Sequence, residues 1–409
     1  MIKAPRGTHD VLPAEQPLWA RVLGEAEALC GAYGYRRIVT PGFEETELFK
    51  RTSGGGSDIV QKEMYTFADR SGRSLTLRPE ATAAIARAYV EHGLAREPQP
   101  QKLYTVAPLY RYAAPQRGRY REHWQVSVEA LGSADPALDA ELIQLYSELL
   151  RRLGVTDYEL LLNSIGDAAC RPAYLERLSA WLDRHADLLD AEARGKVETS
   201  PLRVFDVKSS RVREALEAAP KIGDSLCAAC EEHFAAVRCT LDALGVSYRL
   251  EPTLVRGLDY YTRTTWQFEG PDGGQQSTLS GGGRYDGLVE EIGGAATPGV
   301  GFGAGIERLL LALAAAGASA DPPSLDVFFV LDDGAPRERV LAAMAELRRR
   351  GLACDTDYAS RSLRGQLTQA GRLGAARTVI AGPARAVVRE RGRPDLEVSL
   401  AELAATLAG

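Results

Sequence analysis

Four glycines alternate with other residues between positions 299 and 305, at Gly299, Gly301, Gly303 and Gly305. A repeat of two is that of a β-strand, whose successive side chains point to opposite faces of a sheet. The spacing differs from the G-x-G-x-x-G fingerprint of dinucleotide-binding domains. We therefore expect a strand with one face free of side chains, against which other groups pack closely.

The residues from 315 to 323 are small and end in Pro322-Pro323, a composition typical of a linker. Beyond them the pattern predicts alternating strands and helices, over residues 327–331, 336–350, 361–373 and 378–381. This alternation indicates a small α/β domain of about 85 residues at the C-terminal end.

The segment 134–154 has the clearest helical pattern before this linker. Asp135 can cap the first turn, Pro136 suits the first helical position and Gly154 can end the helix. Leucines at the spacing of one helix face predict that this face is buried: Leu138, Leu142, Leu145, Leu149 and Leu153. Residues 1–165 otherwise mix strand and helix patterns. The next segment is helical and charged, with helices expected over 174–189, 211–216 and 225–244.

The composition excludes several classes of protein. With 45% hydrophobic residues in 409, the chain is too apolar to be disordered, and six cysteines are too few for a disulfide scaffold. No apolar run approaches the roughly 20 residues of a membrane span, and the N-terminus lacks the apolar stretch of a signal peptide. We expect a cytoplasmic protein with no membrane contact.

Charge is distributed unevenly along the chain, whose net charge is −6. The segment Leu325–Gly409 has 13 Arg, no Lys and 11 Asp or Glu, so it carries +2 and the remainder carries −8. A solvated arginine-rich surface is the simplest interpretation of this segment, and contact with an anionic partner is the alternative.

One cysteine pair raises the question of a metal site. Cys227 and Cys230 are spaced C-x-x-C in the helical stretch, with His233 and Cys239 close behind. Structural zinc usually takes four ligands, and the sequence has no second cysteine pair. We therefore interpret the pair as half-buried thiols of a helix and predict no protein zinc site; zinc is the alternative.

Charged residues combine with aromatics and glycines in five segments, a mixture that a pure core does not need: 76–82, 109–121, 256–261, 281–287 and 301–308. Three of these segments carry an arginine that could bind a polyanion, namely Arg111, Arg256 and Arg308. A guanidinium matches phosphate oxygens better than an ammonium does. The sequence therefore predicts a phosphate-binding site.

An acidic polar pocket is predicted beside these arginines, from Glu80, Gln125, Glu129 and Tyr261. Gln125 and Glu129 lie four residues apart on an expected strand, 122–131, so they face the same side. Fixed cations next to fixed carboxylates suit a zwitterionic substrate that attacks a phosphate.

Over nearly its whole length, the chain resembles the histidyl-tRNA synthetases, a family of class II aminoacyl-tRNA synthetases. The most specific string is Leu254-Val255-Arg256-Gly257-Leu258-Asp259-Tyr260-Tyr261, which is similar to the family's histidine-binding signature. Further strings match the family, namely Pro5–Pro13, Leu77–Glu80, Arg119–Arg121, Gly282–Gly287 and Gly301–Gly303 with Glu307-Arg308.

The resemblance implies an α+β fold. An antiparallel-sheet catalytic domain would comprise residues 1–165 and 251–318, a helical insertion would fill 166–250, and an α/β anticodon-binding domain would occupy 324–409. It also implies a homodimer with Thr40-Pro41 at the interface. The activity implied is that of a histidine–tRNA ligase, which joins L-histidine to ATP as an adenylate, with Mg²⁺, and passes it to tRNA(His).

The resemblance also implies a role for each matching residue in histidine binding. Glu80, Thr82 and Gln125 would hold the α-amino group, and Glu129 and Tyr261 would bind the two imidazole nitrogens. The pocket walls would be Tyr260 and Tyr285.

The ATP site is implied in the same way. Arg111 and Arg256 would be catalytic, at the α-phosphate and the attacking carboxylate of histidine, while Arg308 would lie at the γ-phosphate. Arg119 would complete the ATP site. The acceptor end of tRNA would meet the loop residues Gln116, Arg117, Arg119 and Arg121.

The sequence departs from the family's usual pattern at several positions. Ala113 and Ala114 stand where an acid and an arginine are usual, and Ala81 replaces a glycine. The alternative function is that of the regulatory subunit of ATP phosphoribosyltransferase, a histidine-binding relative that does not charge tRNA. The intact 256–261 segment and the C-terminal domain argue against this alternative.

Overall fold

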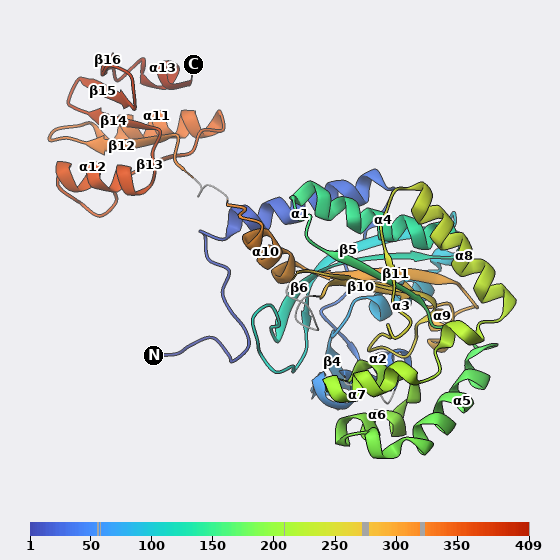
Figure 1. Ribbon diagram of the computed structural model, residues 1–409. Helices are drawn as coiled ribbons and strands as arrows, with labels where there is room; N and C mark the ends of the chain where they lie inside the picture. The colour runs from blue at the N-terminus through green and yellow to red at the C-terminus, as the bar shows by residue number, and fades with distance from the viewer. Residues whose placement is uncertain (55–56, 58, 208, 272–277, 320–323, 409) are drawn as a thin grey trace. The chain divides into compact units, whose positions relative to one another are not determined.

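The computed structural model describes residues 1–54, 57, 59–207, 209–271, 278–319 and 324–408 (Figure 1). Its two compact units are described separately below. The first comprises Met1–Val11 and Leu18–Ser319, and the second comprises Leu12–Pro17 and the described residues from 324 onward. Residues 320–323 of the predicted linker, and residue 409 of the predicted last domain, lie outside the described residues.

The first unit is built on an eight-stranded sheet in the order β1-β5-β6-β11-β10-β9-β7-β8. Its central strands are antiparallel, and the two edge pairs, β1 with β5 and β7 with β8, are parallel. The strands are β1 (Arg36–Arg37), β5 (Gln101–Tyr110), β6 (Glu122–Leu131), β7 (Glu159–Ser164), β8 (Arg249–Leu250), β9 (Thr262–Glu269), β10 (Thr278–Arg284) and β11 (Gly299–Gly305).

One face of this sheet forms the hydrophobic core of the unit. Four helices pack on it, namely α1 (Gln16–Ala32), α4 (Pro136–Leu153), α8 (Ala228–Ala243) and α10 (Ile306–Ala315) (Figure 1). Even-numbered residues of the paired strands β6 and β11, such as Val128 and Phe302, are buried in this core. Because side chains alternate along a strand, Gln125, Glu129 and the odd-numbered glycines face the opposite side.

Helix α4 confirms the predicted helix and both of its ends. The side chain of Asp135 accepts a hydrogen bond from the amide of Ala137 at 2.9 Å, and Gly154 ends the helix with a φ of 82°. All five leucines of the predicted apolar face are buried in the core. Capping and spacing suffice here because the helix has one consistently apolar side.

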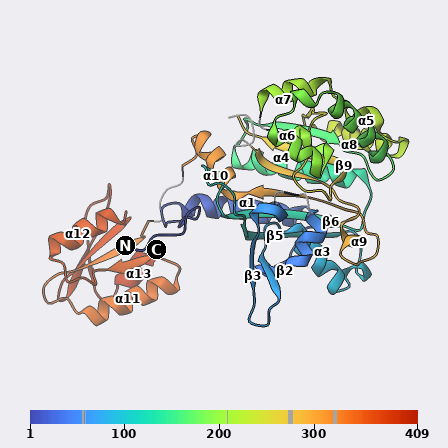
Figure 2. The ribbon, with the colours of Figure 1, turned by 90° about the horizontal axis from the view of Figure 1, so that it is seen from below.

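The helical stretch after β7 forms a group with its own core. Helices α5 (Arg171–Arg184), α6 (Ala191–Thr199) and α7 (Ser210–Ala215) lie together beside the sheet in both ribbon views (Figures 1 and 2). Tyr174 and Leu178 of α5 are fully buried in this core. The three predicted helices are confirmed as α5, α7 and α8, and α6 is additional.

A three-stranded antiparallel sheet, in the order β2-β4-β3, accompanies the large one (Figure 2). Its strands are β2 (Phe43–Glu45), β3 (Tyr65–Ala68) and β4 (Ser74–Leu77). The remaining helices of the unit are α2 (Thr46–Ser53), α3 (Thr82–Glu91), α9 (Leu288–Glu291) and a π-helical turn at Ile59–Glu63. Short 3₁₀ turns lie at Leu94–Arg96, Ala186–Leu188, Pro201–Asp206, Leu216–Ala218 and Ile222–Ser225.

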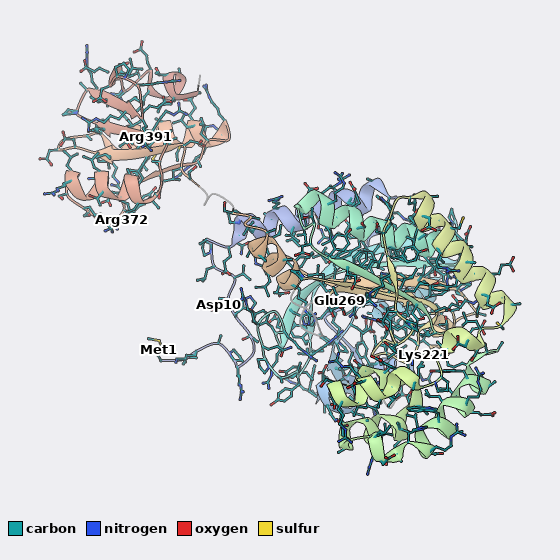
Figure 3. All side chains as sticks on the ribbon, in the orientation of Figure 1. Met1, Asp10, Lys221, Glu269, Arg372 and Arg391 are labelled. Atoms are coloured by element: carbon teal, nitrogen blue, oxygen red, sulfur yellow. The ribbon has the colours of Figure 1, made fainter. Side chains whose placement is uncertain are left out.

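The second unit contains a five-stranded mixed sheet in the order β13-β12-β14-β15-β16. Its elements are β12 (Val327–Leu331), α11 (Arg337–Arg349), β13 (Cys354–Thr356), α12 (Leu363–Arg372), β14 (Arg377–Ala381), β15 (Arg385–Glu390), β16 (Leu396–Ser399) and α13 (Leu403–Ala408). Arg372 and Arg391 are among its basic residues (Figure 3). The predicted strands and helices of this α/β module, and the α+β fold class, are confirmed. Among the described helices, none combines the length and apolar character that a membrane crossing requires.

Candidate active site

Four glycines of two adjacent strands make a floor without side chains on the open face of the large sheet. Gly281 of β10 pairs with Gly303 of β11, and Gly283 pairs with Gly301. Each lies under a side chain from elsewhere in the chain. A Cβ on Gly281 would be 2.2 Å from Arg256 Nη2, and one on Gly283 would be 2.7 Å from Tyr261 Cδ1. This explains the alternating glycines, because the floor leaves room for functional groups.

Glu129 is a buried acid of this site. A Cβ on Gly301 would lie only 1.8 Å from Glu129 Oε2. Thr82 Oγ1 donates a hydrogen bond to Glu129 Oε1 at 2.7 Å, and the hydroxyl of Tyr285 donates to Oε2. Burial raises the pKa of this carboxyl to about 8, against these two hydrogen bonds, which favour the ionised form.

Two further polar groups line the same face. Gln125 projects over Gly303, where a Cβ would lie 2.3 Å from Nε2, and Nε2 donates to Ser127 Oγ at 2.8 Å. Glu80 is 3% exposed and accepts a hydrogen bond from the amide of Ala83, in the first turn of α3, at 3.0 Å. Burial raises the pKa of Glu80. Hydrogen bonds from the amides of Ala83 and Thr82, and the charge of Arg111, partly offset this rise.

Three buried tyrosines close one side of the pocket. The ring centroid of Tyr260 lies 4.7 Å from that of Tyr261 and 5.7 Å from that of Tyr285. Burial raises the pKa of all three phenols above the ordinary value, so they are neutral donors at physiological pH. Each of these side chains combines an apolar ring with a hydroxyl group that needs a polar partner.

The predicted arginines converge beside the glycine floor. Arg256 Nη1 donates to Gln267 Oε1 at 2.6 Å, and Arg111 Nε donates to the carbonyl of Pro79 at 2.7 Å. Arg308 donates to the carbonyls of Gly118 and Thr278.

The fourth arginine, Arg119, donates to Glu63 Oε1 at 3.0 Å. The pKa of Arg308 is lowered by burial and then by repulsion from Arg119, Arg111 and Arg256. Four guanidinium groups therefore share one region, and a polyanion there would relieve their mutual repulsion.

Sequence reasoning missed two residues on this face. His123 lies on β6 two positions before Gln125, and its pKa is lowered to about 3 by burial and by Arg111, Arg308 and Arg119. Gln267 of β9 orients Arg256, and its own Nε2 donates at 2.6 Å to Glu269. His123 could have been predicted, because it lies two positions before Gln125 on the same strand and so faces the same side. No local feature of the sequence indicates Gln267.

Part of the predicted tRNA loop is exposed. Gln116 and Arg117 are exposed, and Gln116 forms an isolated bridge with Arg119. The guanidinium of Arg121 stacks 3.7 Å from the ring centroid of Tyr112. Of these departures from the family's usual pattern, Ala81 and Ala113 are buried and Ala114 is exposed.

Arg284, next to Tyr285 in the Gly282–Gly287 string, faces the core rather than the pocket. Its guanidinium pairs with Asp139 of α4, and both side chains are fully buried. His233 Nε2 lies 3.2 Å from the same carboxylate. Arg284 and His233 lower the pKa of Asp139 against the effect of burial. Arg284 of β10 and His233 of α8 therefore both contact Asp139 of α4, and this buried cluster connects the three elements beneath the site.

The site is chemically divided. One half presents Glu129, Glu80 and tyrosine hydroxyls, which suit a cationic or hydrogen-bonding amino acid. The other half presents guanidinium groups, which suit phosphate oxygens. Such an arrangement can bind a zwitterion beside a polyphosphate and stabilise charge on the phosphorus oxygens when the two react.

Comparison with known proteins agrees with this geometry. The family model described as Histidyl-tRNA synthetase matches residues 7–309. The chain is 48% identical to a histidine–tRNA ligase of Desulforudis audaxviator over 382 residues, covering 93% of this chain and 91% of that protein. It is 44% identical to one of Halothermothrix orenii over 409 residues, with 98% of each covered. Apo histidyl-tRNA synthetase of S. aureus matches the fold with a TM-score of 0.83, at 36% identity and 100% coverage of both chains. The chain belongs to the histidyl-tRNA synthetase family.

Proposed function

We propose that this chain joins L-histidine to ATP to give histidyl-adenylate and then transfers the histidyl group to the 3′ end of tRNA(His). The observation that carries the proposal is the glycine floor. It brings Glu129, Gln125, Tyr261 and Arg256 together on one face of the sheet, next to the other arginines. Family membership supports the same reaction.

In the activation step the histidine carboxylate attacks the α-phosphorus of ATP, and pyrophosphate leaves. Negative charge grows on the α-phosphate oxygens, and Arg256 and Arg111 would stabilise it. Arg256 is suited to this role because Gln267 already fixes its orientation, so little reorganisation is needed during reaction. Holding both reactants side by side supplies the other large part of the rate.

Histidine would be recognised through both imidazole nitrogens, by Glu129 and Tyr261. The α-amino group would bind to Glu80, Thr82 and Gln125, while Tyr260 and Tyr285 form the walls. An amino acid without the two nitrogens would leave buried polar groups without partners. Pockets of this type can discriminate by roughly 10⁴–10⁵-fold.

ATP would enter as its magnesium complex, in which Mg²⁺ offsets phosphate charge. Arg308 and Arg119 would contact the phosphates, with Arg308 at the γ-phosphate. Both side chains already lie in the cluster of like charges, which supports a polyanion as their partner. His123 stays neutral at physiological pH because its pKa is about 3, so it adds no further positive charge to the arginine cluster.

The tRNA would bind at two places. The loop with Gln116, Arg117, Arg119 and Arg121 would meet the acceptor end, and exposed Arg117 is the residue most available to it. The α/β module at 324–409 would bind the anticodon through its arginines. This role places the protein in the cytoplasm, where tRNA is charged.

We also propose that the chain acts as a homodimer. Val39 and Phe43 flank Thr40-Pro41 and are 76% and 51% exposed. A hollow of about 770 Å³ lined by Thr40, Pro41 and neighbouring residues lies next to them. Light scattering would give a mass twice that of one chain, whereas a monomer at working concentration would contradict the dimer.

The proposed function is tested by charging of tRNA(His) with labelled histidine in the presence of ATP and Mg²⁺. The alternative, a histidine-binding regulatory subunit, predicts no charging and instead predicts capture of a short-form ATP phosphoribosyltransferase. The family membership and the curated relatives favour charging. A sample that binds histidine but never acylates tRNA would overturn the assignment.

A further inference from the structure

A compact cluster of thiols and one carboxylate lies outside the active site, where the helical group joins the sheet. Its members are Asp167, Cys170, Cys227 and Cys230, and one donor atom from each lies within 4.8 Å of all the others. The two sulfurs of Cys170 and Cys230 are 3.9 Å apart. Asp167 Oδ1 lies 3.6 Å from the sulfur of Cys170 and 3.9 Å from that of Cys227.

We propose that these four residues form a structural zinc site. Zinc–sulfur bonds of about 2.3 Å in a tetrahedron require sulfur atoms about 3.8 Å apart, and slightly less between sulfur and a carboxylate oxygen. Three of the six donor separations, at 3.6–3.9 Å, therefore have the size of a tetrahedral zinc shell, and all six are within 4.8 Å. Four protein ligands would close the site, as is usual for structural zinc.

Local backbone structure prepares these ligands. The sequence supplies them as two pairs with the same spacing, Asp167-x-x-Cys170 and Cys227-x-x-Cys230. Cys170 and Cys227 are the N-cap residues of α5 and α8, so both lie at the positive end of a helix dipole. The amide of Asp167 also donates a hydrogen bond to the sulfur of Cys170, at 3.3 Å. Both pairs thus present their donors from ordered turns.

The groups around the cluster match its charge. Three thiolates and a carboxylate around Zn²⁺ would carry a net charge of −2, which needs cations nearby. Arg263 Nη2 lies 3.4 Å from Asp167 Oδ2, whereas Oδ1 is the oxygen that contacts Cys170 and Cys227. Arg171 interacts electrostatically with Asp167, Cys170 and Cys230. Such outer partners orient the ligands of metal sites.

Zinc fits the ligands better than other common ions do. Thiolates select soft or borderline metals, whereas calcium and magnesium require oxygen ligands. A disulfide is the competing state, because the sulfurs of Cys170 and Cys230 are neighbours. A disulfide would leave Cys227 and Asp167 without a purpose, whereas zinc uses all four donors.

The site would tie the helical group to the histidine pocket. Arg171 begins α5 immediately after the ligand Cys170, and its Nη2 donates to the carbonyl of Tyr261 at 2.7 Å. On the other side, the amide of Arg263 donates to the carbonyl of Gly166 at 2.7 Å. Arg171 follows Cys170 and Gly166 precedes Asp167 in the sequence. Their hydrogen bonds therefore fix the residues on both sides of Thr262, the first residue of β9. Loss of zinc should loosen this connection.

His233 and Cys239 follow the Cys227–Cys230 pair in the sequence but are not members of the cluster. His233 binds Asp139, and Cys239 is exposed. The missing half of the site comes from Asp167 and Cys170, about 60 residues earlier, and one of its ligands is not a cysteine.

The experiment is metal analysis of the full chain, expressed with zinc in the medium and desalted without chelator. We expect about one zinc per chain. The double variant Cys170→Ser/Cys227→Ser should retain less than about one tenth of that amount. The control Cys239→Ser, which removes a thiol outside the cluster, should retain all of it. Equal zinc in the double variant and the wild type would overturn the proposal.

Two further measurements serve if the double variant does not fold. Asp167→Cys supplies a fourth thiolate, and it should still bind about one zinc and release it more slowly to a chelating dye. Cobalt added to zinc-depleted wild type should give thiolate-to-metal charge-transfer absorption. Wild-type protein with less than about one tenth of a zinc per chain and no cobalt–thiolate absorption, or with a Cys170–Cys230 disulfide as its isolated state, would refute the site.

Discussion

The carboxylate of Glu129 occupies the space that a side chain on Gly301 would need, with Oε2 only 1.8 Å from the position of a Cβ. The two residues face each other across paired strands, in register. Glycine weakens a strand, because it has no side chain to pack and loses more conformational freedom on folding. The alternating glycines are therefore a consequence of the pocket and not of the fold alone.

Gly301→Ala should impair histidine binding more than ATP binding. The added methyl must displace Glu129, and it would also lie 2.6 Å from the carbonyl oxygen of Val128 in β6. Loss of a charged hydrogen bond of about 1.5–3 kcal/mol predicts a rise of roughly 10- to 100-fold in the KM for histidine. Gly305→Ala is the matched control on the same strand, since its Cβ would meet nothing closer than 3.9 Å. Similar KM values in both variants would argue against this role of the floor.

Arg256→Ala should lower the rate of histidyl-adenylate formation by roughly 10²–10³-fold, the usual effect of removing one donor to transition-state charge. Pyrophosphate exchange measures this step without tRNA. Circular dichroism checks that the fold is intact, and Arg184→Ala, an exposed arginine on α5, serves as the control. Wild-type exchange in Arg256→Ala would remove this residue from the mechanism.

The raised pKa of Glu129 predicts a pH-dependent stability of the protein without substrate. Its pKa is about 8 in the folded protein, against an ordinary value of 4.5. Between these values the folded state holds a proton that the unfolded state has lost, so the free energy of unfolding falls as pH rises. The slope is at most about 1.4 kcal/mol per pH unit.

The variant Glu129→Gln isolates this effect. It cannot titrate, so the Tm of the wild type should fall relative to that of the variant between about pH 5 and pH 8. Glu307, whose pKa is about 7 because of burial, contributes the same slope to both proteins and cancels. A constant difference in Tm across this range would mean that Glu129 is ionised throughout.

Arg284→Met should destabilise the first unit by about 3–5 kcal/mol, because it leaves the buried carboxylate of Asp139 without its main counter-charge. Arg249→Ala is the control. Arg249 pairs with Glu159 but keeps 49% of its side chain exposed, so about 0–1 kcal/mol is expected. Urea unfolding followed by tryptophan fluorescence measures both. If both variants lose only a similar small amount of stability, the buried Arg284–Asp139 pair is not needed for the fold.

A chain that ends at residue 319 should retain pyrophosphate exchange but lose most tRNA charging. Each unit has a separate buried core, with Phe329 and Leu347 in that of the second unit, so the first unit should stay folded. Its thermal transition checks this point. Undiminished charging by the shortened chain would refute the proposed anticodon-binding role of the second unit.

Local patterns in the sequence were sufficient for the elements with one strong periodicity. The helix at 136–153 and the glycine strand both follow from spacing and end signals. The arginines of the site could be predicted because guanidinium groups among glycines and aromatics have few structural uses. The resemblance to a family then supplied the roles of individual residues, which remain proposals.

Contacts between distant segments could not be predicted in the same way. Gln267 was missed because its partner Arg256 lies on a loop, and nothing in either segment fixes their distance. The cluster of Asp167 with three cysteines was missed for the same reason, since α5 and α8 meet only in the folded protein. The Gly282–Gly287 segment suggested that Arg284 belongs to the site, yet its side chain faces the core. Successive residues of a strand point to opposite faces, so Arg284 and the preceding Gly283 lie on different sides of the sheet.

The most direct test of the account is ATP–pyrophosphate exchange with Mg²⁺, measured with each of the twenty amino acids in turn. We expect exchange with L-histidine alone, at least roughly 10⁴-fold above any other amino acid. In Glu129→Gln this preference should shrink, while the KM for ATP stays within about twofold. Exchange that is supported equally by another amino acid, or absent with histidine in a folded and histidine-binding sample, would contradict it.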